Sequence, residues 1–114
     1  MGERRFRTYE EFWPFYVAQH RRPGTRALHF LGTTLVLASL LLGALAAPSW
    51  ALLAPVVGYG PAWIGHFFVE RNRPATFTYP WWSLRGDFRM YWLTLSGRMG
   101  PEVERAVALY PSGA

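Results

Sequence analysis

A long stretch without any charged residue constrains what this chain can fold into. Residues 27–69 contain no Asp, Glu, Lys or Arg, and charge returns only at Glu70. An element of a soluble protein rarely needs more than about 12 apolar residues in a row, whereas a bilayer span needs about 20. The stretch therefore predicts two membrane-spanning helices back to back, over residues 26–47 and 49–69, joined near Pro48.

The basic residues all lie outside this stretch. All twelve are arginines, six before it and six after it, and the connection at residues 46–50 carries no charge. Because positive charge is retained on the cytoplasmic side of a membrane, both termini are expected there. The predicted location is a bacterial inner membrane, or the endoplasmic reticulum if the organism is eukaryotic. This topology accounts for the arginines, so no nucleic-acid partner is predicted.

Segments rich in aromatic residues and proline flank the predicted hairpin. Residues 8–20 are expected to form an interfacial helix, with a capping box made by Thr8 and Glu11 and with aromatic side chains at the level of the lipid headgroups. The fold class predicted is all-α: a single membrane domain, 1–114, with a two-span transmembrane hairpin flanked by interfacial amphipathic helices. After the hairpin we expect a loop over 71–86, a second interfacial helix over 87–97 capped by Asp87, and a short helix over 101–110.

The second span is irregular in sequence. Residues 55–65, PVVGYGPAWIG, contain two prolines and three glycines. One interpretation is a packing kink, in which small residues let the two helices approach each other. The other is a helix opened beside a ligand site, since backbone groups freed by proline must be satisfied within the protein.

The three histidines of the chain are expected to converge. His29 lies 19 residues before Pro48 and His66 lies 18 residues after it. At about 1.5 Å per residue, both lie about 27–28 Å from the turn, on adjacent antiparallel helices. His20 ends the helix that leads into the first span, so all three side chains are predicted near the cytoplasmic boundary.

Two interpretations of the histidines remain open at this point. A buried histidine is commonly a hydrogen-bonded packing residue, but imidazole is also the usual ligand of iron, zinc, copper and nickel. Glu70 and Asp87 are candidates to orient the imidazoles, and Glu70, one turn after His66, is alternatively a ligand itself. Residues close after His66 are candidates to support the site or to bind a substrate: Arg71, Asn72 and Arg73.

Three blocks of sequence around the histidines resemble a known family. They are HRRPGTRALH at 20–29, WIGHFFVERNRPA at 63–75 and PWWSLRGDF at 80–88. With these blocks, residues 9–98 resemble the small membrane 2-hydroxy fatty acid dioxygenases, formerly a domain of unknown function. The characterised fungal member acts in α-oxidation during phytosphingosine breakdown.

This resemblance implies an Fe(II)-dependent dioxygenase. His20, His29 and His66 match the histidines taken as iron ligands in the family, and would be the catalytic metal site. The substrates implied are a 2-hydroxy fatty acid and O₂, and the product is the fatty acid one carbon shorter.

Other functions are compatible with the same sequence. A membrane hairpin that acts only as a scaffold would need no metal, a pair of histidines can bind haem, and zinc would favour a structural or hydrolytic role. A homodimer is a further expectation, because a hairpin of this size has little surface with which to enclose a lipid tail.

Overall fold

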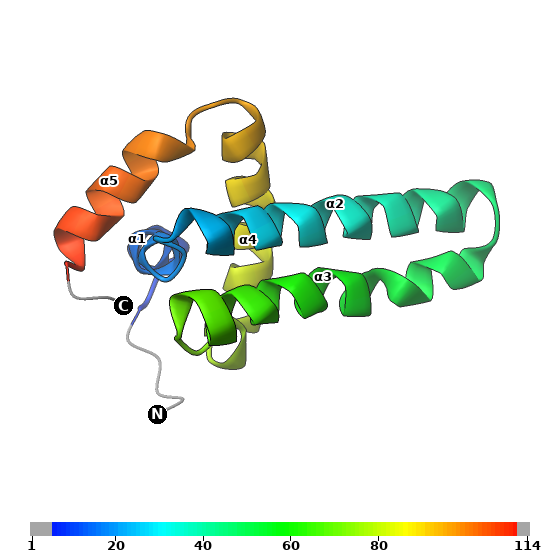
Figure 1. Ribbon diagram of the computed structural model, residues 1–114, viewed down its shortest axis with the longest axis horizontal. Coiled ribbons are helices and arrows are strands. Elements are labelled where there is room, and N and C mark those ends of the chain that lie inside the picture. The colour runs from blue at the N-terminus through cyan, green and yellow to red at the C-terminus, as the bar shows by residue number, and fades with distance from the viewer. Residues whose placement is uncertain (1–5, 112–114) are drawn as a thin grey trace.

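Helices make up the fold of this computed structural model, which describes residues 6–111 and contains no strand among them (Figure 1). A long antiparallel hairpin, residues 23–70, extends from a base that the remaining helices form, within residues 9–18 and 75–109. In chain order the elements are α1 (Tyr9–Ala18), α2 (Pro23–Leu45), the 3₁₀ helix η1 (Pro48–Leu53), α3 (Ala54–Ile64), the π-helix η2 (Gly65–Glu70), the 3₁₀ turn η3 (Ala75–Phe77), α4 (Pro80–Leu95) and α5 (Met99–Leu109).

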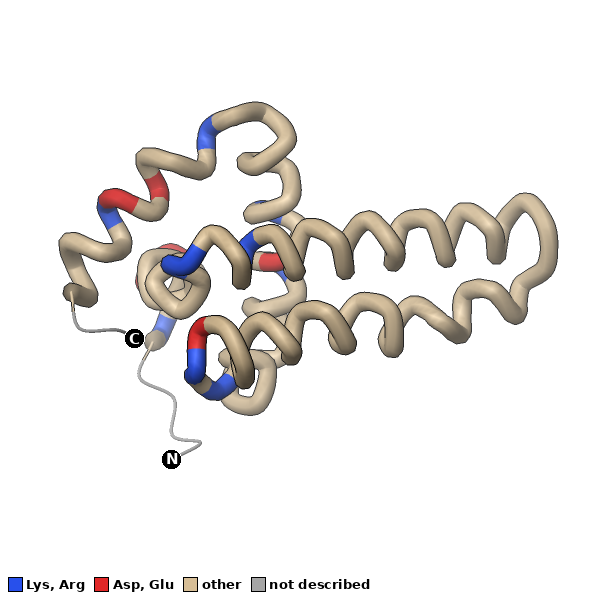
Figure 2. Tube along the Cα trace, in the orientation of Figure 1, with Lys and Arg blue, Asp and Glu red and all other residues tan. Residues whose placement is uncertain are grey.

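The hairpin contains two helical segments that are long and apolar enough to cross a membrane. They are α2 and the continuous run Pro48–Glu70, each of 23 residues. Much of their surface faces outward, and Leu45 and Leu52 are each 77% exposed. Charged residues gather at the base, and the outer part of the arm carries none (Figure 2).

Glycines let the two arms of the hairpin approach closely. A Cβ atom added at Gly32 of α2 would lie 2.7 Å from the carbonyl oxygen of Gly58 in α3. Nearer the base, a Cβ atom at Gly65 would lie 3.3 Å from the Cα atom of Thr25. Such contacts through small residues are typical of helices that pack within membranes. They agree with the packing interpretation of the glycines in residues 55–65.

The end of the second arm departs from α-helical geometry. Its last six residues, Gly65–Glu70, form a π-helix. Arg71 then adopts a left-handed conformation with φ of 63°, and the Asn72 N–H donates to the His66 carbonyl at 2.8 Å. Turns of π-helix are rare and are frequent at functional sites. The irregularity of this arm therefore includes His66 itself.

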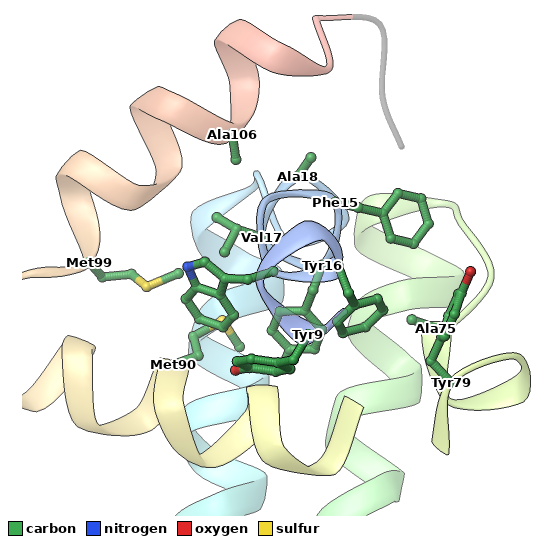
Figure 3. Close-up of a cluster of buried hydrophobic side chains, with 12 residues drawn as sticks. Tyr9, Phe15, Tyr16, Val17, Ala18, Ala75, Tyr79, Met90, Met99 and Ala106 are labelled. Atoms are coloured by element: carbon green, nitrogen blue, oxygen red, sulfur yellow. The ribbon is translucent and has the colours of Figure 1, made fainter. Parts of the chain in front are cut away.

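The base is built around α1. Its side chains Phe12, Trp13 and Tyr16 are 0%, 2% and 1% exposed and belong to the buried cluster shared with α4 and α5 (Figure 3). The Trp13 Nε1–H donates to Glu102 Oε1 of α5 at 2.7 Å. The expectation that these aromatic residues lie among lipid headgroups is therefore wrong. Because α1 is apolar on nearly all sides, other helices of the protein cover it.

The helices α1 and α4 begin with different sequence features. The expected cap of α1 is present, since Thr8 Oγ1 accepts the Glu11 N–H at 3.1 Å. In contrast, α4 begins at Pro80 and not at Asp87. Proline is favoured in the first helical turn, where a backbone N–H has no partner to lose. Asp87 thus lies within α4, and the expected loop over 71–86 is shorter than predicted.

The close approach of the two arms predicts a specific sensitivity to size at Gly32. Gly32→Ala would force the Gly58 carbonyl away and destabilise the protein by about 1–3 kcal/mol, the usual cost of overpacking. Gly60→Ala is the matched control, because a Cβ atom there meets nothing within 4 Å. Thermal unfolding in detergent measures both variants. Equal unfolding temperatures for the two would contradict the packing described here.

Candidate metal centre

Three histidine side chains meet where the hairpin joins the base. His20 follows α1, His29 lies in α2, and His66 lies in η2. One ring nitrogen of each lies within 4.8 Å of the others, and the ring centroids are 4.3–4.8 Å apart. The three residues are 1%, 6% and 3% exposed. The structure therefore brings together the histidines that the sequence analysis placed at one depth.

Backbone carbonyls anchor two of the rings. The Nδ1–H of His20 donates to the Tyr16 carbonyl at 2.6 Å, and the Nδ1–H of His29 donates to the Thr25 carbonyl at 3.0 Å. A carbonyl oxygen can only accept, so the proton of each neutral ring is on Nδ1 and the Nε2 lone pair is free. The sequence analysis missed these partners, although each lies only four residues before its histidine.

Asn72 anchors the third ring. Its Oδ1 accepts from His66 Nδ1–H at 2.7 Å, while its Nδ2–H donates to the Gln19 carbonyl at 3.0 Å. Because the second bond requires the amide nitrogen, the amide oxygen must face His66. Asn72 therefore fixes the tautomer of His66 and ties this ring to the segment just before His20.

The Nε2 atoms of the cluster present lone pairs to one another and therefore favour a positive charge between them. Those of His20 and His29 are 3.0 Å apart, and with both Nδ1 atoms protonated two lone pairs meet. An extra proton is disfavoured there, because burial first, and then the neighbouring histidines, hold the pKa of His20 well below its usual 6.5. A metal ion about 2.1 Å from each of two imidazole nitrogens holds them about 3.0 Å apart when they subtend a right angle. The spacing of His20 and His29 therefore fits a first-row transition metal, and His66 offers a third imidazole nitrogen in the same group.

The structure does not bring Glu70 among the imidazole nitrogens. Its Oε1 accepts from the Arg22 N–H at 3.0 Å and from the Thr25 hydroxyl at 2.8 Å. A carboxylate at the start of a helix satisfies groups there and interacts favourably with the helix dipole. Glu70 thus holds the first turn of α2, whose Thr25 carbonyl in turn holds His29.

Asp87 supports the cluster through a different residue from the one expected. Its carboxylate accepts from the Tyr16 hydroxyl and not from an imidazole, while the Tyr16 carbonyl anchors His20. Burial raises the pKa of Asp87 from 3.8 to about 7, and the hydrogen bond from Tyr16 opposes that rise. Asp87 also lines two cavities together with His29.

Arg71 and Arg73 lie on another surface. Both are exposed and line an open depression with Phe67 and Phe68. The guanidinium of Arg73 packs over the ring of Phe77, 5.1 Å from its centroid. The structure therefore does not place either arginine against the histidine cluster.

A small cavity of about 10 Å³ touches all three histidines. Ser83 and Trp63 also line it, and within residues 6–111 the buried Ser83 Oγ and Trp63 Nε1 have no hydrogen-bond partner. An unsatisfied buried donor costs about 1–3 kcal/mol. These two atoms therefore point to a ligand or water that completes the site. No sequence pattern identified them, because a lone serine or tryptophan has no diagnostic spacing.

A larger cavity of about 230 Å³ adjoins the small one. It lies between α2, α3 and α4, and both cavities are lined by His29, Tyr59, Ala62 and Asp87. The histidine cluster is thus adjacent to a space that can accept an organic molecule.

The whole of this site falls within a match to a known family. Residues 6–99 match the family described as 2-hydroxy-palmitic acid dioxygenase Mpo1-like. The chain belongs to this family. The resemblance seen in the sequence is thereby confirmed, and the family's description names a dioxygenase and a 2-hydroxy fatty acid. Comparison with curated proteins and with solved structures gave no match.

The hydrogen bond from His66 to Asn72 predicts an effect on metal affinity. Asn72→Ala should weaken metal binding by about 10–100-fold, the usual effect of removing a partner that orients a ligating histidine. Titration of the metal-free protein with Fe(II) or Co(II) measures this change. Arg73→Ala is the control, because this exposed side chain does not contact the cluster. If both variants bind metal like the wild type, Asn72 does not position a ligand.

The raised pKa of Asp87 predicts how the stability of the metal-free protein depends on pH. Between the unfolded value of 3.8 and the folded value of about 7, Asp87 binds more protons in the folded state than in the unfolded state. Its contribution to stability should therefore fall as pH rises through this range, while that of His20, whose pKa is lowered chiefly by burial, should rise. Asp87→Asn should remove the falling contribution, so that this variant gains stability relative to the wild type as pH rises, and the exposed Glu10→Gln should show no such gain. Unfolding temperatures from pH 4.5 to 8 in detergent test this, and parallel curves for wild type and Asp87→Asn would refute it.

Proposed function

We propose that the chain is an Fe(II)-dependent dioxygenase that converts a 2-hydroxy fatty acid into the fatty acid one carbon shorter. The observation that carries the proposal is the cluster of three buried imidazoles whose Nδ1 atoms are all held by acceptors. This arrangement leaves three neutral Nε2 atoms for one ion. The family match supplies the reaction class and the substrate class.

Iron is the metal that suits this reaction. Oxidation by O₂ requires a metal that changes its oxidation state, which zinc does not do, and neutral imidazole binds ferrous iron well. Fe(II) would be held by His20, His29 and His66 and would supply electron transfer to O₂ when bound. The protein holds the rings: the Tyr16 and Thr25 carbonyls and Asn72 keep each proton on Nδ1. The lone pairs thus stay directed into the cluster.

The proposed reaction balances with one O₂ for each acid. The bond between C1 and C2 breaks, C2 becomes the new carboxyl carbon, and C1 leaves as carbon dioxide. The remaining oxygen atom and two hydrogen atoms form water. Because the substrate itself provides the electrons, no organic cosubstrate is required.

The proposed location is a membrane, with the hairpin inserted and both termini cytoplasmic. The exposed leucines of the arm are explained by a hydrocarbon surrounding, and the arginines at the base by the cytoplasmic side (Figure 2). The histidine cluster then lies near the headgroups. That is the depth at which the carboxylate of a fatty acid lies in a bilayer.

Metal content and turnover together test the proposal. Anaerobically purified wild type should contain about one iron per chain and should consume O₂ with 2-hydroxyhexadecanoic acid, forming pentadecanoic acid. His66→Ala should lose both properties, because the cluster loses one of its three proposed ligands. Thr34→Ala, a change at an exposed residue of α2, should retain both.

Hexadecanoic acid without the 2-hydroxyl group is the substrate control and should not be oxidised. If neither protein binds metal after reconstitution with Fe(II), the dioxygenase is excluded for this chain. The hairpin would then be better explained as a non-enzymatic scaffold.

A further inference from the structure

The larger cavity follows the hairpin away from the histidines. On α2 its lining residues are His29, Thr33 and Val36, which lie on one face of the helix at intervals of four and three residues. On the opposite arm the lining proceeds from Ala62 towards Ala54. At about 1.5 Å per residue, the groove extends roughly 10–12 Å towards the hairpin turn.

The chemistry of the lining changes along this groove. At the end next to the metal centre it includes His29, Asp87 and the ring of Tyr59. Towards the turn it is lined by aliphatic and small residues, and Leu84 and Phe88 of α4 contribute apolar side chains on the third side. The further residues of the apolar part are Val36, Ala54, Pro55 and Gly58. A polar end followed by an apolar groove matches a molecule with one acidic head and one hydrocarbon tail.

The small cavity offers hydrogen-bond donors to the head of such a molecule. Ser83, 2% exposed, has no partner for its hydroxyl group among the described residues, and the same holds for the indole N–H of Trp63. Both residues line the cavity that touches the three histidines. Carboxylate oxygens are acceptors only, so they match these two donors.

We infer that the two cavities form one binding site for a fatty acid, with its head beside Ser83 and Trp63 and its tail in the groove between α2, α3 and α4. This inference deepens the proposed function and rests on it for the 2-hydroxyl group. The site orients the acid so that C1 and C2 lie at the histidines while the tail points towards the hairpin turn. Ser83 and Trp63 act as positioning residues for the carboxylate.

The volume of the groove sets how much of the tail it holds. A methylene group is about as large as a water molecule, ~30 Å³, so the cavity of about 230 Å³ holds roughly eight. Affinity should rise about fourfold for each methylene group within this length. A longer tail leaves the groove near Ala54 and enters hydrocarbon, so selectivity among longer acids should be slight.

Photolabelling locates the tail without requiring turnover. The purified protein in nanodiscs is irradiated with hexadecanoic acid that carries a diazirine midway along its tail. We expect labels on Val36, Leu84 and Phe88 that 2-hydroxyhexadecanoic acid displaces. Labels confined to outward residues such as Leu41 and Leu52, with no displacement, would overturn the inference. Equal labelling of the groove by a diazirine phosphatidylcholine that the acid does not displace would assign the groove to bilayer lipid instead.

Two pairs of variants test the two ends of the site. Ala54→Phe should weaken the binding of 2-hydroxyhexadecanoic acid about tenfold and leave the eight-carbon acid unaffected, because only the longer tail reaches this position. Leu52→Phe, at a residue 77% exposed, should change neither. The same ratio of affinities in both variants would place the tail elsewhere.

Ser83→Ala separates a role in binding from a role in packing. It should raise the unfolding temperature of the ligand-free protein, because it removes an unsatisfied hydroxyl group, and it should weaken the binding of the acid without reducing iron content. Unchanged affinity for the acid would overturn the placement of the head. If the labels and affinities are as expected but no 2-hydroxy acid is oxidised, the fatty acid site stands and the dioxygenase proposal fails.

Discussion

The histidine cluster depends on the close contact between Thr25 of α2 and Gly65 at the start of η2. A Cβ atom at Gly65 would lie 3.2 and 3.3 Å from the Cγ2 and Cα atoms of Thr25, so a larger residue would push Thr25 back by a few tenths of an ångström. Thr25 anchors His29 through its carbonyl and binds Glu70 through its hydroxyl, while His66 follows Gly65 directly. This one contact therefore sets the separation of two of the three rings.

The third ring depends on how the base packs against the hairpin. α1 is buried among α4 and α5, and the hydrogen bond from Tyr16 to Asp87 links it to α4. His20 follows the end of α1, and its Nδ1–H donates to the Tyr16 carbonyl. The Arg26 guanidinium also donates to the His20 carbonyl at 2.8 Å, which links the start of α2 to this residue. The cluster thus lies where the apolar hairpin meets the buried core of the base, and its geometry depends on both.

The boundary between the hairpin and the base combines two environments that the proposed fatty acid substrate requires. The imidazoles and Asp87 lie on one side, with the donors of Ser83 and Trp63, which have no partner among residues 6–111. The apolar groove begins on the other side. Neutral imidazoles suit this position, because burial disfavours their charged form and so preserves the lone pairs that bind a metal. The histidines can therefore lie beside the apolar groove without carrying an unpaired buried charge.

The sequence by itself determined the features that depend on local composition. The uncharged stretch predicted a helical hairpin, and equal spacing from Pro48 predicted that His29 and His66 lie at one depth, because helical rise is constant. The family resemblance predicted the reaction class that the family match names. Only the tertiary structure decided which groups support the rings: the expected carboxylates Glu70 and Asp87 bind elsewhere, and backbone carbonyls hold His20 and His29. Asn72, one of the candidates named from the sequence, holds His66. Tertiary packing also turned the aromatic face of α1 inward and placed the two cavities side by side. Both features depend on contacts between residues far apart in the chain, which spacing along the sequence does not encode.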